Sequence, residues 1–270
     1  MHEVQREANC IGLAWASLAR GYTYGTKRDN IMRTINLSVA AVSIAISVMS
    51  ISAPAFAQEE AAEEAEGPIT ISGSITGVSD YRFRGVSLSD KDFAIQPTIT
   101  ISPESGFYVG AWASNVAENT GNDVEVDIYA GFAGGDAVTY DIGATYYIYP
   151  GVSSLNYVEL TGKLGTTIGP ATVGGQLSYV PSQDNTGNTD NFYVATNAAI
   201  AIPNSPITLT GSVGYEDGFF AADKVDWSLG ATAAISGFTL GIAYVDTNRR
   251  TTFAFKDSTA GVVFSLSYGF

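Results

Sequence analysis

The sequence predicts an all-β fold, a transmembrane antiparallel up-and-down β-barrel that we expect to have twelve strands. Three observations lead to this prediction. A secretory signal precedes the part of the chain that folds, apolar and polar residues then alternate with a period of two, and the connections between the alternating segments are long and short in turn. This combination is typical of barrels of the bacterial outer membrane.

Residues 32–57 have the three parts of a secretory signal peptide. Arg33 supplies a short positive region, residues 37–51 form an apolar region, and Ala55-Phe56-Ala57 is a small-x-small cleavage site. A membrane-anchoring helix is the alternative interpretation, but Pro54 would break such a helix. We therefore expect export through a cleaved signal peptide and localisation in the outer membrane.

The segments on either side of the signal are predicted to lie outside the barrel. Residues 1–31 are interpreted as an over-extended translation start, and they hold the single histidine, His2, and the single cysteine, Cys10. Residues 58–68 are rich in glutamate and alanine, which predicts a disordered acidic leader. The barrel is assigned to residues 69–270.

Composition excludes several classes of function. The full chain has 13 basic and 27 acidic side chains and a net charge of −14. Five of the basic and three of the acidic residues precede Gln58, so cleavage would leave a net charge of −16. Such an acidic chain would repel the phosphates of a nucleic acid. The expected partners are instead the outer-membrane lipid, the barrel assembly machinery, and small hydrophilic solutes or ions.

Enzymatic activity is not expected. The predicted barrel has no histidine to act as a base and no cysteine to act as a nucleophile or thiolate ligand. Glu125 and Asp127 would share a strand face, but alternation alone explains that. Residues 184–190 offer oxygen ligands without the spacing of a calcium loop, and we interpret them as a solvated external loop. We predict no catalytic residues, no cofactor and no metal site.

The alternation begins at Ile69. We expect the first strand to cover residues 69–84, with isoleucine and glycine on one face and serine, threonine and finally Asp80, Arg82 and Arg84 on the other. Twelve such segments follow one another, each near the ~9–11 residues that a tilted strand needs to cross a bilayer. An even number of strands places both chain termini on the periplasmic side.

The connections support a barrel more strongly than a soluble sandwich, which has no reason to alternate loop length. The expected long connections are residues 87–92, 117–123, 149–156, 180–191, 216–224 and 246–258. The expected short connections are residues 102–106, 133–137, 169–170, 203–206 and 236–237.

The last segment ends on an aromatic residue. Tyr268 and Phe270 close an alternating apolar strand, which resembles the recognition signal of the outer-membrane assembly machinery. Aromatic residues near strand ends are candidates for the girdles at the two membrane interfaces. These candidates are Tyr81, Phe83, Phe107, Tyr146, Tyr244 and Tyr268.

Four short motifs resemble a known family. They are residues 79–87 (SDYRFRGVS), 106–116 (GFYVGAWASNV), 127–131 (DIYAG) and 146–151 (YYIYPG). With the rest of residues 69–270, they resemble the TorF-type porin family, proteobacterial outer-membrane proteins of poorly defined function. The resemblance implies a barrel and a pore, and it supplies no substrate.

Strand parity predicts which charged residues meet inside the barrel. A charged side chain at mid-membrane is costly on the lipid face, so the lumen is the cheaper place. An arginine pair facing acidic residues there would form a constriction that sets ion selectivity, or a salt-bridge network that only braces the barrel. The candidate lumen residues are Asp80, Arg82, Arg84, Glu125, Asp127, Asp141, Glu159, Lys163 and Asp226.

The predicted function is a porin-like channel for passive diffusion of small hydrophilic solutes or ions, with a mild preference for cations. The alternative is a non-conducting structural or surface-recognition barrel that acts through its external loops. The candidate loops for that role are residues 216–224, with Phe219 and Phe220, and residues 246–258, with Arg249, Arg250, Phe253 and Phe255.

Overall fold

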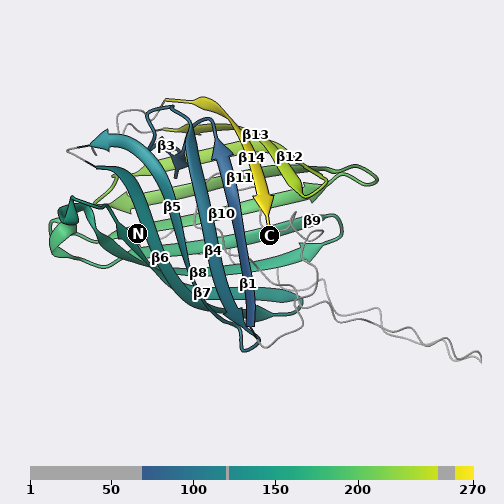
Figure 1. Cartoon of the computed structure of the whole chain (residues 1–270), viewed down its shortest axis with the longest axis horizontal. Helices are drawn as coiled ribbons and strands as arrows, with labels where there is room; N and C mark the ends of the chain where they lie inside the picture. Colours follow the sequence, from purple (N-terminus) through teal and green to yellow (C-terminus); the bar gives the residue numbers. More distant parts are fainter. Residues whose placement is uncertain (1–68, 120–121, 249–258) are drawn as a thin grey trace, which may run out of the picture. The chain divides into compact units, whose positions relative to one another are not determined.

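The computed structural model describes residues 69–119, 122–248 and 259–270, and within them twelve antiparallel strands form a closed barrel (Figure 1). The predicted fold class and strand number are therefore confirmed. The barrel strands are β1 (Ile69–Val78), β4 (Ala94–Pro103), β5 (Phe107–Asn119), β6 (Asn122–Gly135), β7 (Val138–Ile148), β8 (Tyr157–Ile168), β9 (Ala171–Val180), β10 (Asn191–Ala201), β11 (Ile207–Gly218), β12 (Lys224–Ile235), β13 (Phe238–Thr247) and β14 (Gly261–Gly269).

The barrel closes between its first and last strands. β1 pairs with β4 on one side and with β14 on the other, for example Ile75 with Pro97 and with Tyr268. Figure 1 shows β1 in dark blue beside β14 in yellow. Each strand therefore has two neighbours and no edge is left open, as the hydrocarbon of a bilayer requires.

Four short elements lie in the connections. β2 (Arg82–Phe83) and β3 (Val86–Ser87) pair only with each other, in the connection between β1 and β4. Two 3₁₀ turns, η2 (Ser153–Leu155) and η3 (Asp184–Thr186), lie between β7 and β8 and between β9 and β10. Across the described ranges, no helix has the length and apolar character needed to cross a membrane.

The two faces of each strand differ as the alternation predicts. In β12 the side chain of Leu229 is 70% exposed, whereas those of Asp226 and Thr232 are buried. The same contrast holds around the barrel, where exposed isoleucine, leucine and phenylalanine alternate with inward serine, threonine, tyrosine and charged residues. The outer surface is thus apolar and the core of the protein is a polar lumen.

Two of the predicted long connections are wrong. β5 and β6 continue to Asn119 and Asn122, so residues 117–123 are mostly strand. Glu216 and Lys224, the expected ends of a loop, are direct partners in β11 and β12. The strands are therefore longer than the sequence predicted at both places, and the strict alternation of loop length fails there.

The apolar outer face makes a prediction about stability. Leu229→Arg, at the middle of β12, is expected to destabilise the barrel in a bilayer by about 2–4 kcal/mol, because it places a charge in hydrocarbon. Ser228→Arg is the matched control, because the neighbouring side chain faces the lumen. Urea titrations in phosphatidylcholine vesicles measure both variants. Equal losses for the two variants would contradict the assignment of the faces.

Candidate functional site

The segment between β1 and β4 turns into the barrel instead of continuing the wall. Its flanking residues Val78 and Ala94 are direct partners, so a two-residue turn would be enough to join the two strands. Residues 79–93 intervene, and within them Phe83 pairs with Val86 in the β2–β3 hairpin. We call residues 79–93 the inward segment.

The tip of the hairpin packs against the barrel wall. Arg84 and Gly85 form its two-residue turn with φ angles of 48° and 85°, the left-handed backbone that such a turn requires. A Cβ on Gly85 would lie 2.8 Å from the Cβ of Asp226 and 3.0 Å from that of Thr247. Only glycine allows the backbone to come this close to β12 and β13.

Arg82 braces the inward segment. Its Nε lies 2.6 Å from Oδ2 of Asp80, and its Nη1 donates hydrogen bonds to the carbonyls of Gly85 and Thr259, at 3.2 and 2.7 Å. Ser87 Oγ donates to the other oxygen of Asp80 at 2.6 Å. These contacts link the two strands of the hairpin to each other and to the chain that enters β14.

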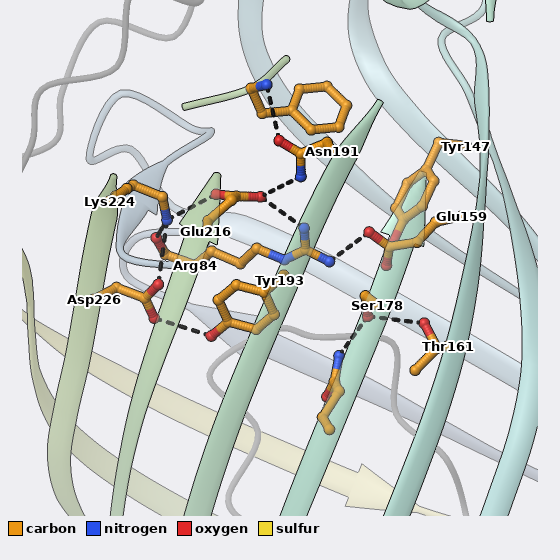
Figure 2. A network of polar contacts seen from close by, with 12 residues as sticks. Arg84, Tyr147, Glu159, Thr161, Ser178, Asn191, Tyr193, Glu216, Lys224 and Asp226 are labelled. Atoms are coloured by element: carbon orange, nitrogen blue, oxygen red, sulfur yellow. Dashed lines mark hydrogen bonds and ion pairs between the residues drawn. The ribbon is translucent and has the colours of Figure 1, made fainter. Parts of the chain in front are cut away.

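Arg84 holds the segment across the lumen (Figure 2). Its Nη2 lies 2.5 Å from Glu159 Oε2 on β8, and its Nη1 lies 2.7 Å from Glu216 Oε1 on β11. Lys224 Nζ contacts Glu216 Oε2 at 3.0 Å and Asp226 Oδ2 at 3.2 Å, and it donates to the Arg84 carbonyl at 2.5 Å. We call these five residues, all of them buried, the Arg84 network.

The surroundings of Arg84 favour its charged form. Its guanidinium carbon lies 4.3 Å from the centre of the Tyr193 ring, an arrangement that stabilises a cation. Burial alone lowers the pKa of Arg84, but the carboxylates of Glu159 and Glu216 raise it well above its ordinary value. The Tyr193 hydroxyl donates to Asp226 at 3.1 Å, so the aromatic ring is itself fixed in place.

The other side of the inward segment contacts β5 to β7. The Tyr81 ring packs against Trp112 with 5.3 Å between ring centres, and its hydroxyl donates to Glu125 at 3.0 Å. Tyr149 donates to the second Glu125 oxygen at 3.0 Å. Asp127 is fully buried in the same region, and neither of its carboxylate oxygens has a hydrogen-bond partner among the described residues. The inward segment therefore spans the lumen between opposite walls. More acidic than basic side chains of the wall contact it.

A polar recess lies in the lumen beside the network. Asp141 and Lys163 are direct partners on β7 and β8 and both line the recess. The Tyr108 ring lies over Gly131, where a Cβ would collide with it, and its hydroxyl donates to Asp141 at 2.9 Å. The other main lining residues are Tyr129, Tyr147, Glu159, Thr161 and Gln176.

The remaining inner wall is formed by small polar side chains. They project from β1 and from β11 to β14 and keep intermediate exposure, so solvent reaches this part of the lumen. Examples are Ser74, Ser212, Ser228, Ser265 and Ser267.

The chain has one matching family and several structural relatives. A family described as "Bacterial protein of unknown function (Gcw_chp)" matches residues 62–267. The chain belongs to this family. No curated protein matches it. The TorF-type resemblance stays a prediction, because the description of the Gcw_chp family names no porin type.

Solved structures show the fold of this Gcw_chp member to be that of outer-membrane porins. The KdgM porin has a TM-score of 0.52 at 9% identity, covering 74% of this chain and 99% of that chain. The same porin in complex with disordered oligogalacturonate has a TM-score of 0.51 at 8% identity, with the same coverage. The NanC porin has a TM-score of 0.49 at 13% identity, covering 73% of this chain and 98% of that chain.

The structure places the predicted lumen residues inside the barrel. Eight of the nine are buried and Lys163 is half-buried. Arg84, Glu159 and Asp226 come together in one network, whereas Asp80 with Arg82 and Asp141 with Lys163 form separate groups. Their role as a constriction remains a proposal.

The predicted course of the first strand is wrong. β1 ends at Val78, so Asp80, Arg82 and Arg84 belong to the inward segment and not to the wall. Tyr81 is 1% exposed and packs inside the lumen, so it is not part of a girdle. Phe83 is half-buried against Tyr147 and is no girdle residue either. Phe107, Tyr146, Tyr244 and Tyr268 are exposed on the outer face.

Sequence reasoning missed Glu216 and Lys224, the two network residues that it assigned to a loop. Lys224 lies two positions before Asp226, so strand parity carried two residues further would have placed it on the lumen face. Phe219 and Phe220, which the surface-recognition alternative places in an external loop, are half-buried, and Phe220 packs against Tyr157.

The other candidate loop and the chain end complete the comparison. Arg249, Arg250, Phe253 and Phe255 lie outside the described residues. Phe270 is 63% exposed, and its backbone N–H and C=O pair with Gly73 across the β1–β14 seam. Its role as an assembly signal stays a prediction.

Proposed function

We propose that this protein is a porin-like channel of the outer membrane through which small hydrophilic solutes or ions diffuse passively, with the inward segment as its constriction. The observation that supports this most is the position of that segment. It crosses a lumen whose remaining wall is lined by small, solvent-accessible polar residues. A loop folded into a barrel narrows the passage, and its charges then select the ions that pass.

The charges of the lumen support a preference for cations. The lumen groups described above include seven carboxylates, at Asp80, Glu125, Asp127, Asp141, Glu159, Glu216 and Asp226, against four basic side chains, at Arg82, Arg84, Lys163 and Lys224. The ligand named with one KdgM structure is an oligogalacturonate, a polyanion. A lumen with excess negative charge is unsuited to such a solute, so we do not extend that ligand to this chain.

The proposal includes the route to the membrane. Residues 32–57 direct export and are cleaved, Phe270 and Tyr268 signal to the assembly machinery, and both termini remain in the periplasm. The inward segment, which begins at the end of β1, then lies at the external end of the barrel. No enzymatic activity, cofactor or metal belongs to this function.

Conductance in a planar bilayer tests the proposal. The purified protein is expected to give discrete current steps, and a salt gradient is expected to give a reversal potential that indicates cation preference. Asp226→Asn is expected to reduce that preference, because it removes a lumen carboxylate without changing side-chain size. Asp136→Asn, in an exposed short turn, is the matched control. A folded barrel that passes no current would favour the alternative, a recognition barrel acting through its loops.

A further inference from the structure

The inward segment covers a carboxyl group of the barrel wall. Asp127 on β6 has Trp112 of β5 and Tyr147 of β7 as its direct strand partners. Tyr81 of the inward segment packs against Trp112, with 5.3 Å between the ring centres. Phe83 of the same segment packs against Tyr147, with 6.2 Å between the ring centres. The segment therefore lies over Asp127, whose exposed fraction is 0%.

The surroundings of Asp127 are unfavourable to a negative charge. Among the described residues, neither of its oxygens accepts a hydrogen bond. The charged groups that act on it are Glu125, two positions earlier on the same strand, and Glu159 on β8, and both are acidic. Arg84 of the inward segment is already bonded to Glu159 and Glu216. A buried carboxylate without a partner is far more costly than the neutral carboxyl group.

The other titratable groups around Asp127 are tyrosines, whose hydroxyls stay neutral up to about pH 10. They are Tyr81 of the inward segment, Tyr129 on β6, Tyr147 and Tyr149 on and just after β7, and Tyr157 on β8. Tyr81 and Tyr149 each donate to one oxygen of Glu125, at 3.0 Å. These two donors stabilise the charged form of Glu125, whereas Asp127 receives no such support.

We propose that Asp127 carries a proton while the inward segment is seated over it, and that loss of this proton at higher pH displaces the segment. The inference rests on the proposed function, in which the segment is the constriction of the channel. Ionisation would place an uncompensated charge in a dry site beside Glu125 and Glu159. Displacement of the segment lets water reach that charge. The lumen carboxylates other than Asp127 still outnumber the four basic side chains, so the proposed cation preference is unchanged.

The direction of the pH dependence follows from the state that holds the proton. Asp127 keeps its proton in the seated state, and in the displaced state it ionises as an ordinary exposed aspartate does. The seated state therefore binds one proton more, so acid favours it and rising pH favours the displaced state. Each pH unit in this range is expected to change the ratio of displaced to seated barrels by up to about tenfold.

Quenching of Trp112 fluorescence by acrylamide measures the position of the segment, because Tyr81 packs on this ring in the seated state. Trp227→Phe leaves Trp112 as the only tryptophan in residues 58–270. The purified mature protein with this substitution, in phosphatidylcholine vesicles, is compared from about pH 5 to about pH 9, where few other side chains of the barrel titrate. We expect quenching to increase several-fold with pH. A flat curve would overturn the inference without any substitution at Asp127.

Asp127→Asn identifies the group that titrates. The amide has the size of the carboxyl group and cannot ionise, so quenching is expected to stay weak at every pH. Asp136→Asn, in an exposed turn, is the matched control and is expected to follow the unsubstituted protein. Infrared spectra at neutral pH are expected to show the carbonyl stretch of a protonated carboxyl group that is absent in Asp127→Asn. A pH-dependent quenching curve in Asp127→Asn, or an infrared spectrum that this substitution leaves unchanged, would contradict the inference.

Quenching and conductance separate the two proposals. Quenching reports movement of the segment whether or not the barrel conducts, so a silent barrel with pH-dependent quenching would support the switch and contradict the channel. A conducting barrel whose quenching does not change with pH would support the channel and contradict the switch.

Discussion

Replacing residues 79–93 with an Asn-Gly turn is expected to raise the single-channel conductance several-fold. Val78 and Ala94 are already partners at the ends of β1 and β4, so a tight turn can join these strands without disturbing the wall. The replacement removes the hairpin that crosses the lumen, and with it Arg82 and Arg84. Current steps in a planar bilayer, compared at the same salt concentration, measure the change.

A companion variant removes the acidic charges that the replacement would leave without Arg84. Without Arg84, the buried carboxylate of Glu159 loses its basic partner in the Arg84 network and that of Glu216 keeps only Lys224, which would destabilise the fold. We therefore pair the replacement with Glu159→Gln and Glu216→Gln. An unchanged conductance in a folded companion variant would show that the inward segment is not the constriction.

Arg84→Met is expected to reduce the free energy of unfolding by about 3–5 kcal/mol, the range for removing one partner of a buried ion pair. The guanidinium bonds two carboxylates at once, at 2.5 and 2.7 Å, and its side chain is 1% exposed. Both carboxylates would remain buried after the substitution. Urea unfolding in vesicles, followed by tryptophan fluorescence, measures the loss.

A second substitution identifies the cause of this loss. Arg84→Met combined with Glu159→Gln is expected to recover a large part of the stability, because one of the two uncompensated charges is then removed. Glu159 has no basic partner in the Arg84 network other than Arg84, whereas Glu216 retains Lys224. Lys91→Met, at an exposed position of the same segment, is the matched control. Equal losses for Arg84→Met and Lys91→Met, with no recovery from Glu159→Gln, would contradict the assigned role of Arg84.

The porin fold and the proposed channel depend on different observations. The closed ring of strands and its apolar outer face establish the barrel, and a barrel of twelve strands lies between those filled by side chains and those with a wide channel. At this size the contents of the lumen decide what passes. The inward segment is therefore the part of the molecule on which experiments should concentrate.

The sequence by itself determined the number of wall strands, the faces of those strands and the polar character of the lumen. These properties follow from local alternation: a residue such as Asp226 or Leu229 has its face set by the parity of its own strand. The same parity placed Glu125, Asp127, Asp141, Glu159 and Lys163 on inward faces, where the structure has them.

Only the tertiary structure decided the path of residues 79–93 and the partners of Arg84. Alternation continues through this segment, so the sequence pattern favours a longer β1, yet the chain leaves the wall after Val78 and Arg84 pairs with the buried Glu159 and Glu216. These lie 75 and 132 positions from Arg84 in the chain and become neighbours only when the barrel closes. A pattern with a period of two fixes which face a side chain takes, and it contains no information about which distant strand will stand opposite.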